Sequence, residues 1–137
     1  MATITTEVRI AAPPTDVWDA LRDFGAVHIR LVPGFVVDTR LEGNARIVTF
    51  GNGAIARELL VGIDEGARRL AYSVVDAPTL GFTHHNASAQ VFEDGAAGSR
   101  FVWIADVLPD AVAPTVQAMM EQGVEVAKRT LEPTRAA

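Results

Sequence analysis

One long amphipathic segment at the carboxyl end constrains the fold more than any other feature of this chain. Between Asp110 and Leu131, apolar side chains recur at steps of three and four, and charged and amide side chains fall mainly on the other face. The apolar positions are Val112, Val116, Met119, Met120, Gly123, Ala127 and Leu131. This spacing predicts a helix of about six turns. Because residues 35–108 are typical of strands and turns, we expect the helix to lie against the inner face of a sheet.

Alternating strands separated by turn residues are predicted for most of the remaining chain. Residues 3–11 carry a regular alternation that is typical of a half-buried strand, and the inner face consists of Ile4, Thr6, Val8 and Ile10. Six more strands are predicted at residues 35–41, 45–50, 54–63, 69–75, 82–92 and 100–108. Turn sequences such as Gly51-Asn52-Gly53 separate them.

Two short helices are predicted between the first and second strands. Pro14 suits the first turn of a helix, and an apolar stripe follows it at Val17, Trp18, Leu21 and Phe24. Gly25 is expected to end this helix as a left-handed cap, and residues 26–32 are expected to form a second small helix. The elements together predict a single α+β domain over residues 1–137. In it, a seven-stranded curved antiparallel sheet wraps around a long C-terminal helix, with two short helices after strand one.

Composition excludes several classes of protein. The 137 residues contain no cysteine, which excludes disulfides and thiolate metal sites. The formal charge of −5 and the scattering of the 12 Lys and Arg residues argue against nucleic acid as a partner. The chain opens without a signal-peptide pattern, and it has no apolar run of the length that a membrane span requires. We therefore expect a cytoplasmic protein without a membrane span, either a monomer or a homodimer.

Several local sequences, taken with the order of the elements, resemble those of a known superfamily. They are residues 11–18, the turn Val32-Pro33-Gly34, residues 57–60 followed by Asp64, residues 69–72 and residues 101–103. Over essentially its whole length, the chain is similar to the polyketide cyclase-like branch of the START-like (SRPBCC) helix-grip superfamily. The resemblance implies a cavity between the concave face of the sheet and the long helix, closed by the short helices and neighbouring loops. Because this superfamily includes lipid carriers, hormone receptors, cyclases and co-chaperones, the fold alone does not select a function.

Side-chain alternation predicts which residues line that cavity. His85 lies on the apolar face of its strand, so we expect it to point inward. Both faces of residues 54–63 carry apolar side chains, and we favour the face of Leu59 over that of Glu58. The predicted ligand-binding residues are Leu59, Tyr72, His85, Phe101, Trp103, Met119 and Gly123.

Two features have a structural interpretation beside a functional one. The small inward residues leave space either for a ligand or for close packing of the helix on the sheet, and they are Ala87, Ala89, Ala105 and Gly123. Arg57, if it points inward, pairs either with a ligand carboxylate or with a protein carboxylate. The protein candidates are Glu58, Asp106 and Glu7.

These residues favour one function and leave two alternatives. An apolar cavity without a convincing catalytic arrangement favours binding or carriage of a small hydrophobic molecule that is lipid-, polyketide- or aromatic-like. The first alternative is a cyclase- or dehydratase-type enzyme in which His85 and Tyr72 act as acid-base groups, although each also fits a core position. The second is a surface interaction module resembling the co-chaperone relatives. No metal and no cofactor are predicted, because His84 and His85 point to opposite faces of one strand and no phosphate-binding loop occurs.

Overall fold

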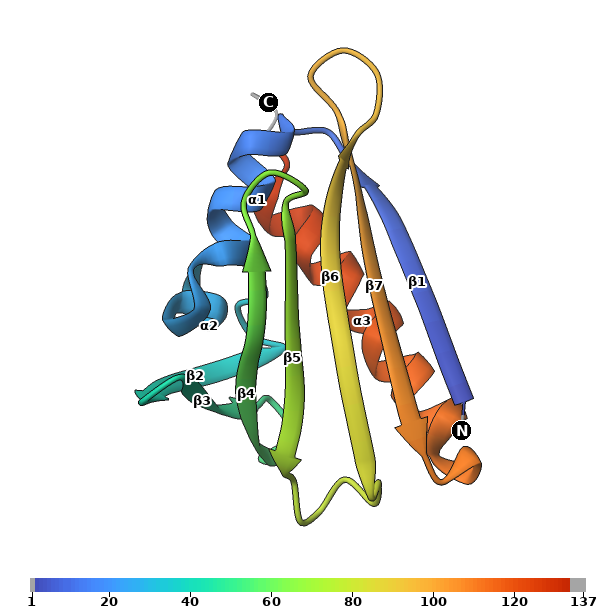
Figure 1. Ribbon diagram of the computed structural model, residues 1–137. Coiled ribbons are helices and arrows are strands. Elements are labelled where there is room, and N and C mark those ends of the chain that lie inside the picture. Colours follow the sequence, from blue (N-terminus) through green and yellow to red (C-terminus); the bar gives the residue numbers. More distant parts are fainter. Residues whose placement is uncertain (1, 134–137) are drawn as a thin grey trace.

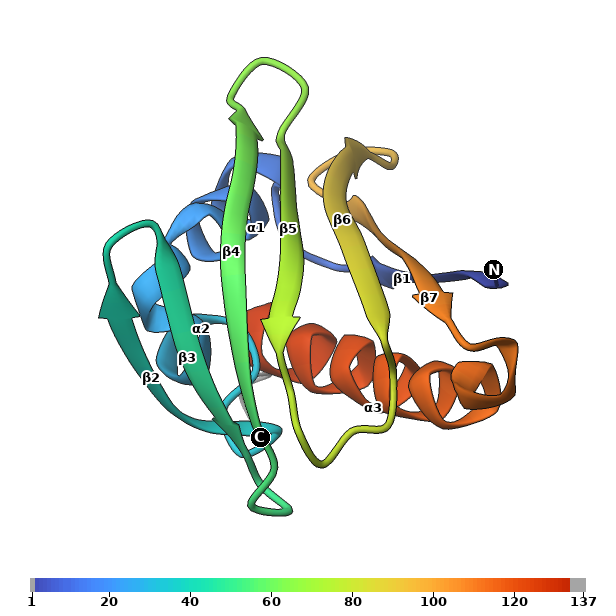
Figure 2. The same cartoon turned by 60° about the horizontal axis from the view of Figure 1, so that its bottom comes forward.

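Seven strands of the described chain form one antiparallel sheet, and its concave side faces the helices (Figures 1 and 2). The computed structural model describes residues 2–133. The strands are β1 (Ala2–Ile10), β2 (Val36–Glu42), β3 (Ala45–Phe50), β4 (Ile55–Asp64), β5 (Arg69–Asp76), β6 (His84–Glu93) and β7 (Ser99–Leu108). The helical segments are α1 (Pro14–Arg22), the 3-10 turn η1 (Phe24–Ala26), α2 (Val27–Arg30), the 3-10 turn η2 (Asp110–Val112) and α3 (Ala113–Leu131). The predicted α+β architecture is confirmed.

The strand order is β1-β7-β6-β5-β4-β3-β2, so the first two strands of the chain form opposite edges of the sheet. The chain crosses from one edge to the other through α1, η1 and α2. These segments therefore cover one end of the concave face, while α3 runs diagonally past β5, β6 and β7 (Figure 1). None of the helices within residues 2–133 is both long enough and apolar enough to cross a bilayer.

The register of the hairpins decides which side chains meet on the concave face. Around the turn Gly51-Asn52-Gly53, the pairing of β3 with β4 sets Arg46 opposite Glu58. The pairing of β6 with β7 sets Ala89 opposite Trp103. Directly paired residues of an antiparallel sheet project to the same face. The oppositely charged side chains are therefore neighbours, and the indole of Trp103 lies beside a small residue.

The middle of the predicted apolar stripe of α3 is buried. Val116, Met120, Gly123 and Ala127 are buried between α3 and the sheet, and so are Val124 and Val126, which the predicted stripe did not include. In proteins, most of the stability of an amphipathic helix comes from packing of its apolar face against the rest of the fold.

The start of α3 differs from the prediction. Residues 110–112 form the 3-10 turn η2, and the α-helix begins at Ala113. Pro114 lies in the first turn, where its missing N–H group breaks no helical hydrogen bond. The proline therefore favours a helix that begins here.

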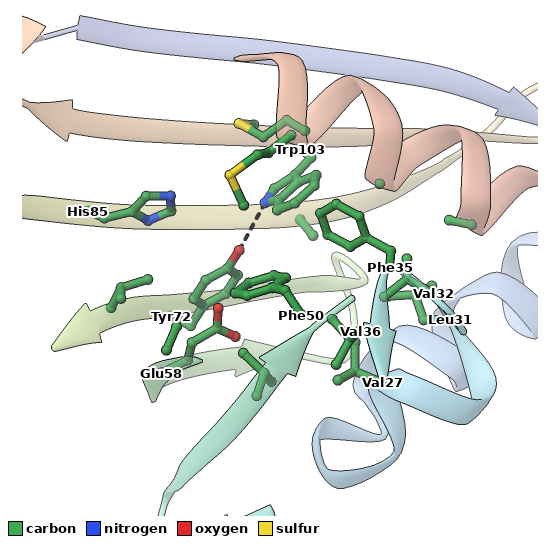
Figure 3. A pocket seen from close by; sticks show the side chains of 18 of the residues that line it. Val27, Leu31, Val32, Phe35, Val36, Phe50, Glu58, Tyr72, His85 and Trp103 are labelled. Carbon is green, nitrogen blue, oxygen red and sulfur yellow. Dashed lines mark hydrogen bonds between the residues drawn. The ribbon is translucent and has the colours of Figure 1, made fainter. Parts of the chain in front are cut away.

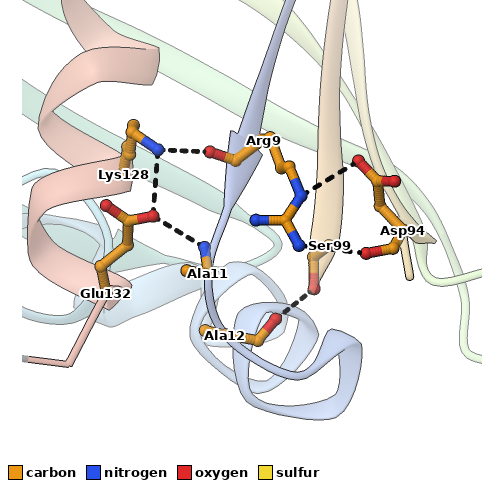
Figure 4. A network of polar contacts seen from close by, with 7 residues as sticks. All are labelled: Arg9, Ala11, Ala12, Asp94, Ser99, Lys128 and Glu132. Carbon is orange, nitrogen blue, oxygen red and sulfur yellow. Dashed lines mark hydrogen bonds and ion pairs between the residues drawn. The ribbon is translucent and has the colours of Figure 1, made fainter. Parts of the chain in front are cut away.

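A network of polar contacts fastens the carboxyl end of α3 to β1 and to the residues that follow β1 (Figure 4). Lys128 Nζ donates a hydrogen bond to the carbonyl oxygen of Arg9 at 2.7 Å and pairs with Glu132 at 3.0 Å. The Glu132 carboxylate accepts the backbone N–H of Ala11 at 2.8 Å. Charge-assisted hydrogen bonds of this kind are stronger than neutral ones, so they help to hold α3 in place over the sheet.

Gly25 does not have the role predicted for it. The helix α1 is capped by Asp23, and Gly25 lies in η1 without a positive φ angle. A Cβ atom at Gly25 would lie 2.8 Å from Cδ1 of Leu41, which is closer than real Cβ atoms approach a neighbour. The glycine therefore permits close packing of η1 against β2 and is not a left-handed cap.

Candidate functional site

An internal cavity lies between the concave face of the sheet and α3 (Figure 3). The cavity has a volume of about 100 Å³. The helices α1 and α2 and the loop between β5 and β6 complete its wall with Leu21, Val27 and Leu80. The large apolar side chains of the lining include Phe35, Phe50, Phe82, Phe101, Met119 and Met120. The cavity therefore presents mainly hydrocarbon and aromatic surface.

Three of the predicted site residues meet at one end of this cavity. Trp103 Nε1 donates a hydrogen bond to the Tyr72 hydroxyl at 3.1 Å, and the rings of Tyr72 and His85 stack with centroids 6.4 Å apart. Phe82 packs against His85 with ring centroids 4.9 Å apart. Tyr72 is 5% exposed and His85 is 8% exposed. Tyr72, His85 and Trp103 therefore line the same cavity.

A buried ion pair lies beside Tyr72. Arg46 Nε donates to Glu58 Oε1 at 2.7 Å, and these two side chains are only 9% and 8% exposed. The Arg46 guanidinium also donates to the carbonyl oxygen of Phe24 at 3.3 Å and lies 4.0 Å from the centroid of that ring. The two opposite charges compensate each other, so the pair brings polar atoms to the cavity without net charge.

Burial controls the ionisation of the two titratable groups that face this end of the cavity. Burial raises the pKa of Tyr72 well above its usual range, and the negative charge of Glu58 raises it further. Burial lowers the pKa of His85 because the charged imidazolium loses hydration, although the Glu58 carboxylate opposes part of this effect. Near pH 7, both groups are therefore neutral, Tyr72 as a phenol and His85 as an imidazole.

The lowered pKa of His85 makes stability depend on pH. The unfolded histidine has a pKa near 6.5 and the folded one lies lower, so the unfolded chain binds more protons between the two values. We expect the contribution of His85 to the free energy of unfolding to be complete above pH 6.5, to fall as pH decreases through this window, and to level off below the folded pKa. Urea unfolding of the wild type and of His85→Gln at several pH values checks this. A stability difference that stays constant with pH would contradict it.

The predicted inner face of β4 is wrong. Ala56 and Glu58 are buried and line the cavity, whereas Leu59 lies on the opposite face and is not part of the lining. A charged side chain is rarely buried without a partner, so the sequence of β4 alone favours Glu58 outside. The partner is Arg46 of the neighbouring strand, which makes the buried position of Glu58 tolerable.

Arg57 also points away from the cavity. It pairs with Glu42 of β2 at 2.5 Å on the exposed face, and both side chains are about half exposed. Arg57 therefore has a structural partner, but not one of the three carboxylates that the sequence suggested. It does not line the cavity and has no position from which to hold a ligand carboxylate there.

The remaining predicted residues, Phe101, Met119 and Gly123, line the cavity. At Gly123 the structure favours close packing over empty space. A Cβ atom there would lie 2.9 Å from Cζ3 of Trp103 and 3.4 Å from Cε2 of Phe35. The glycine thus accommodates two aromatic rings that α3 would otherwise push aside.

Sequence reasoning missed Arg46, Phe35 and Phe50 as cavity residues. A signal for Arg46 was present, because Arg46 and Glu58 each lie six residues from Asn52, the centre of the predicted turn. Hairpin pairing then sets these opposite charges directly across from each other. Phe35 precedes β2 and Phe50 ends β3, where alternation gives no reliable direction. Their rings meet edge to face with centroids 5.5 Å apart.

The groups that face the cavity suit an organic molecule. They combine aromatic and aliphatic surface with the hydrogen-bonding groups of Tyr72, His85 and Glu58. Within residues 2–133, no group of three or more His, Asp or Glu side chains is arranged to hold a metal ion.

Comparison with known proteins gives one matching family and several similar structures. A family model described as polyketide cyclase / dehydrase and lipid transport matches residues 1–132. A search of curated proteins gave no match. Among solved structures, the chain is similar to the protein XoxI from Bacillus cereus, with 21% identity, 96% of each chain covered and a TM-score of 0.85.

Two further structures are similar at lower scores. One is a START superfamily protein from Mycobacterium smegmatis, with 12% identity, coverage of 95% of this chain and 94% of that chain, and a TM-score of 0.73. The other is a point mutant of norcoclaurine synthase from Thalictrum flavum, solved with a transition-state analogue. It shares 20% identity over 95% of this chain and 94% of that chain, with a TM-score of 0.68. At these identities the likeness establishes a shared fold.

Proposed function

The chain belongs to the polyketide cyclase / dehydrase and lipid transport family, and from this premise we propose that it binds a small, mainly apolar molecule in the cavity between the sheet and α3. The observation that carries the proposal is the lining, which is apolar except for a few polar groups gathered at one end. This is the usual composition of a small-molecule site. Protein cores are close-packed and contain few voids larger than a water molecule, so the cavity is not explained by core packing alone.

The volume suggests the size of the molecule. The cavity volume of about 100 Å³ is below the roughly 300 to 1,000 Å³ of most small-molecule sites, so the cavity favours a small compound. An apolar cavity of about 150 Å³ is large enough to bind a benzene ring. We therefore propose a compound of one or two rings in preference to a long acyl chain.

A two-ring hydrocarbon tests this proposal. We expect 2-methylnaphthalene to shift the NMR resonance of the Trp103 indole N–H, because this group lies at the cavity. The indole N–H of Trp18 serves as an internal control, since it bonds to Glu65 and Trp18 is not part of the lining. The probe should also raise the melting temperature, because it binds the folded state. An unchanged spectrum at the solubility limit of the probe would refute the proposal.

Two variants of equal added volume locate the binding site. Ala56→Leu extends a side chain from β4 into the cavity and should weaken binding of 2-methylnaphthalene. Ala118→Leu adds the same groups on the exposed face of α3 and should leave binding unchanged. An equal effect of both variants would place the probe outside the cavity.

A cyclase- or dehydratase-type enzyme is the second candidate, and one observation favours it. Nδ1 of the neutral His85 has no hydrogen-bond partner within residues 2–133, and the side chain faces the same cavity as the Tyr72 hydroxyl. In such an enzyme, His85 would accept a proton and Tyr72 would donate one. A candidate ligand is incubated with the protein, recovered and analysed by mass spectrometry, which distinguishes a carrier from an enzyme. A carrier returns the ligand unchanged, whereas an enzyme returns a product of different mass or chromatographic retention.

A further inference from the structure

Two groups at the polar end of the cavity have hydrogen-bonding capacity that the protein does not use. His85 Nδ1 is buried and has no hydrogen-bond partner among residues 2–133. The Tyr72 oxygen accepts the indole N–H of Trp103, and no acceptor within the described residues takes the Tyr72 hydroxyl proton. Figure 3 shows both side chains at the same space. Buried polar groups are almost always paired, so both groups are expected to have a partner when the cavity is occupied.

The charges beside these groups already compensate one another. Arg46 pairs with Glu58 and is held further by the carbonyl oxygen and the ring of Phe24. A ligand carboxylate in this cavity would lose its hydration without finding an unpaired cation among the lining residues. A hydroxyl group is neutral, and it can accept one hydrogen bond while it donates another.

We propose that the cavity selects a neutral molecule that carries a hydroxyl group and discriminates against the corresponding carboxylate. This inference rests on the ligand-binding function proposed above. The ligand oxygen accepts the free proton of Tyr72, and the ligand hydroxyl donates to His85 Nδ1. The apolar body of the ligand lies against apolar residues of the lining, which include Phe101 and Met120.

Two probes of nearly the same shape isolate the hydroxyl group, namely 2-naphthol and 2-methylnaphthalene. Tyr72→Phe removes one hydrogen bond and keeps the ring, so it should weaken 2-naphthol binding roughly three- to tenfold. The dissociation constant of 2-methylnaphthalene should change by less than about twofold. His85→Phe should likewise weaken 2-naphthol binding and leave the dissociation constant of 2-methylnaphthalene nearly unchanged. In Tyr72→Phe, the indole N–H of Trp103 also loses its acceptor. This loss affects the binding of both probes, so 2-methylnaphthalene controls for it.

The outcomes separate this inference from the function on which it rests. Dissociation constants are measured by NMR titration of the full chain. If both probes bind and each variant weakens them equally, the hydroxyl site is wrong but the apolar-ligand function stands. If neither probe binds the wild type, both proposals fail.

A third probe tests the selection against negative charge. We expect 2-naphthoate to bind the wild type about tenfold or more weakly than 2-naphthol, because its charge is desolvated without compensation. Glu58→Gln leaves Arg46 without its carboxylate partner. Arg46 can then pair with the probe carboxylate, so the ratio of the two dissociation constants should decrease. If circular dichroism shows that Glu58→Gln does not fold, the wild-type comparison decides alone. Equal binding of 2-naphthoate and 2-naphthol by the wild type would overturn the proposed selection.

Discussion

Arg46→Met should lower the free energy of unfolding by about 3–5 kcal/mol, because it leaves the Glu58 carboxylate buried without a cation. Both side chains are less than a tenth exposed, so water cannot replace the lost partner. Methionine preserves most of the apolar stem of Arg46, which isolates the effect of charge from that of volume. Urea denaturation followed by circular dichroism measures the change.

A control and a rescue make this prediction specific. Arg57→Met breaks the pair with Glu42 of β2 on the exposed face of the same sheet and should cost no more than about 1 kcal/mol. The double variant Arg46→Met/Glu58→Leu removes both buried charges and should recover most of the lost stability. Equal losses for Arg46→Met and Arg57→Met, or no recovery in the double variant, would contradict the assigned role of the buried pair.

Trp103→Ala should cost about 3 kcal/mol, because it removes the largest side chain between β7 and α3 and leaves space that the neighbours fill only in part. Gly123→Leu should also destabilise the protein, by about 1–3 kcal/mol, since its side chain overlaps the rings of Trp103 and Phe35. Ala118→Leu, on the exposed face of the same helix, should have little effect. Thermal and urea unfolding of each variant provide the measurement.

The double variant Trp103→Ala/Gly123→Leu tests whether these two residues share one space. The new leucine can occupy the volume that the indole leaves, so the double variant should lose less stability than the two single losses added together. A coupling of about 0.5–3 kcal/mol is expected for residues in contact. If the two losses of stability add exactly, the absence of a side chain at Gly123 is not what makes room for the Trp103 ring.

Local patterns in the sequence were sufficient for most of the architecture. The predicted bounds of β3 are those observed, and four residues of the predicted stripe of α3 are buried, namely Val116, Met120, Gly123 and Ala127. The inward direction of His85 also followed from its strand, where one face is polar and the other consists of small and apolar residues. Such patterns are reliable because the repeat of a strand or helix assigns each side chain to a face, and burial of the apolar face dominates the energy.

Side-chain alternation does not identify the inner face of a strand when both faces carry apolar residues. On β4, Leu59 competes with Leu60 and Ala56 for the core, so alternation could not decide the inner face. An unpaired buried charge is costly, and the sequence of β4 alone supplies no partner for Glu58. The Arg46 guanidinium pairs with Glu58, and the carbonyl oxygen of Phe24, which only the tertiary structure brings close, accepts a hydrogen bond from Arg46. These contacts offset that cost.

The sequence alone therefore determined the order of strands and helices, the buried face of α3 and the convergence of Tyr72, His85 and Trp103 on one space. The tertiary structure decided that Glu58 faces the cavity and that Leu59 does not. It also decided that Gly123 lies against the rings of Trp103 and Phe35. The physical reason is the range of the interactions. A side-chain repeat is a property of a few consecutive residues, whereas the Phe24 carbonyl group that holds Arg46 and the rings that pack against Gly123 come from other parts of the chain.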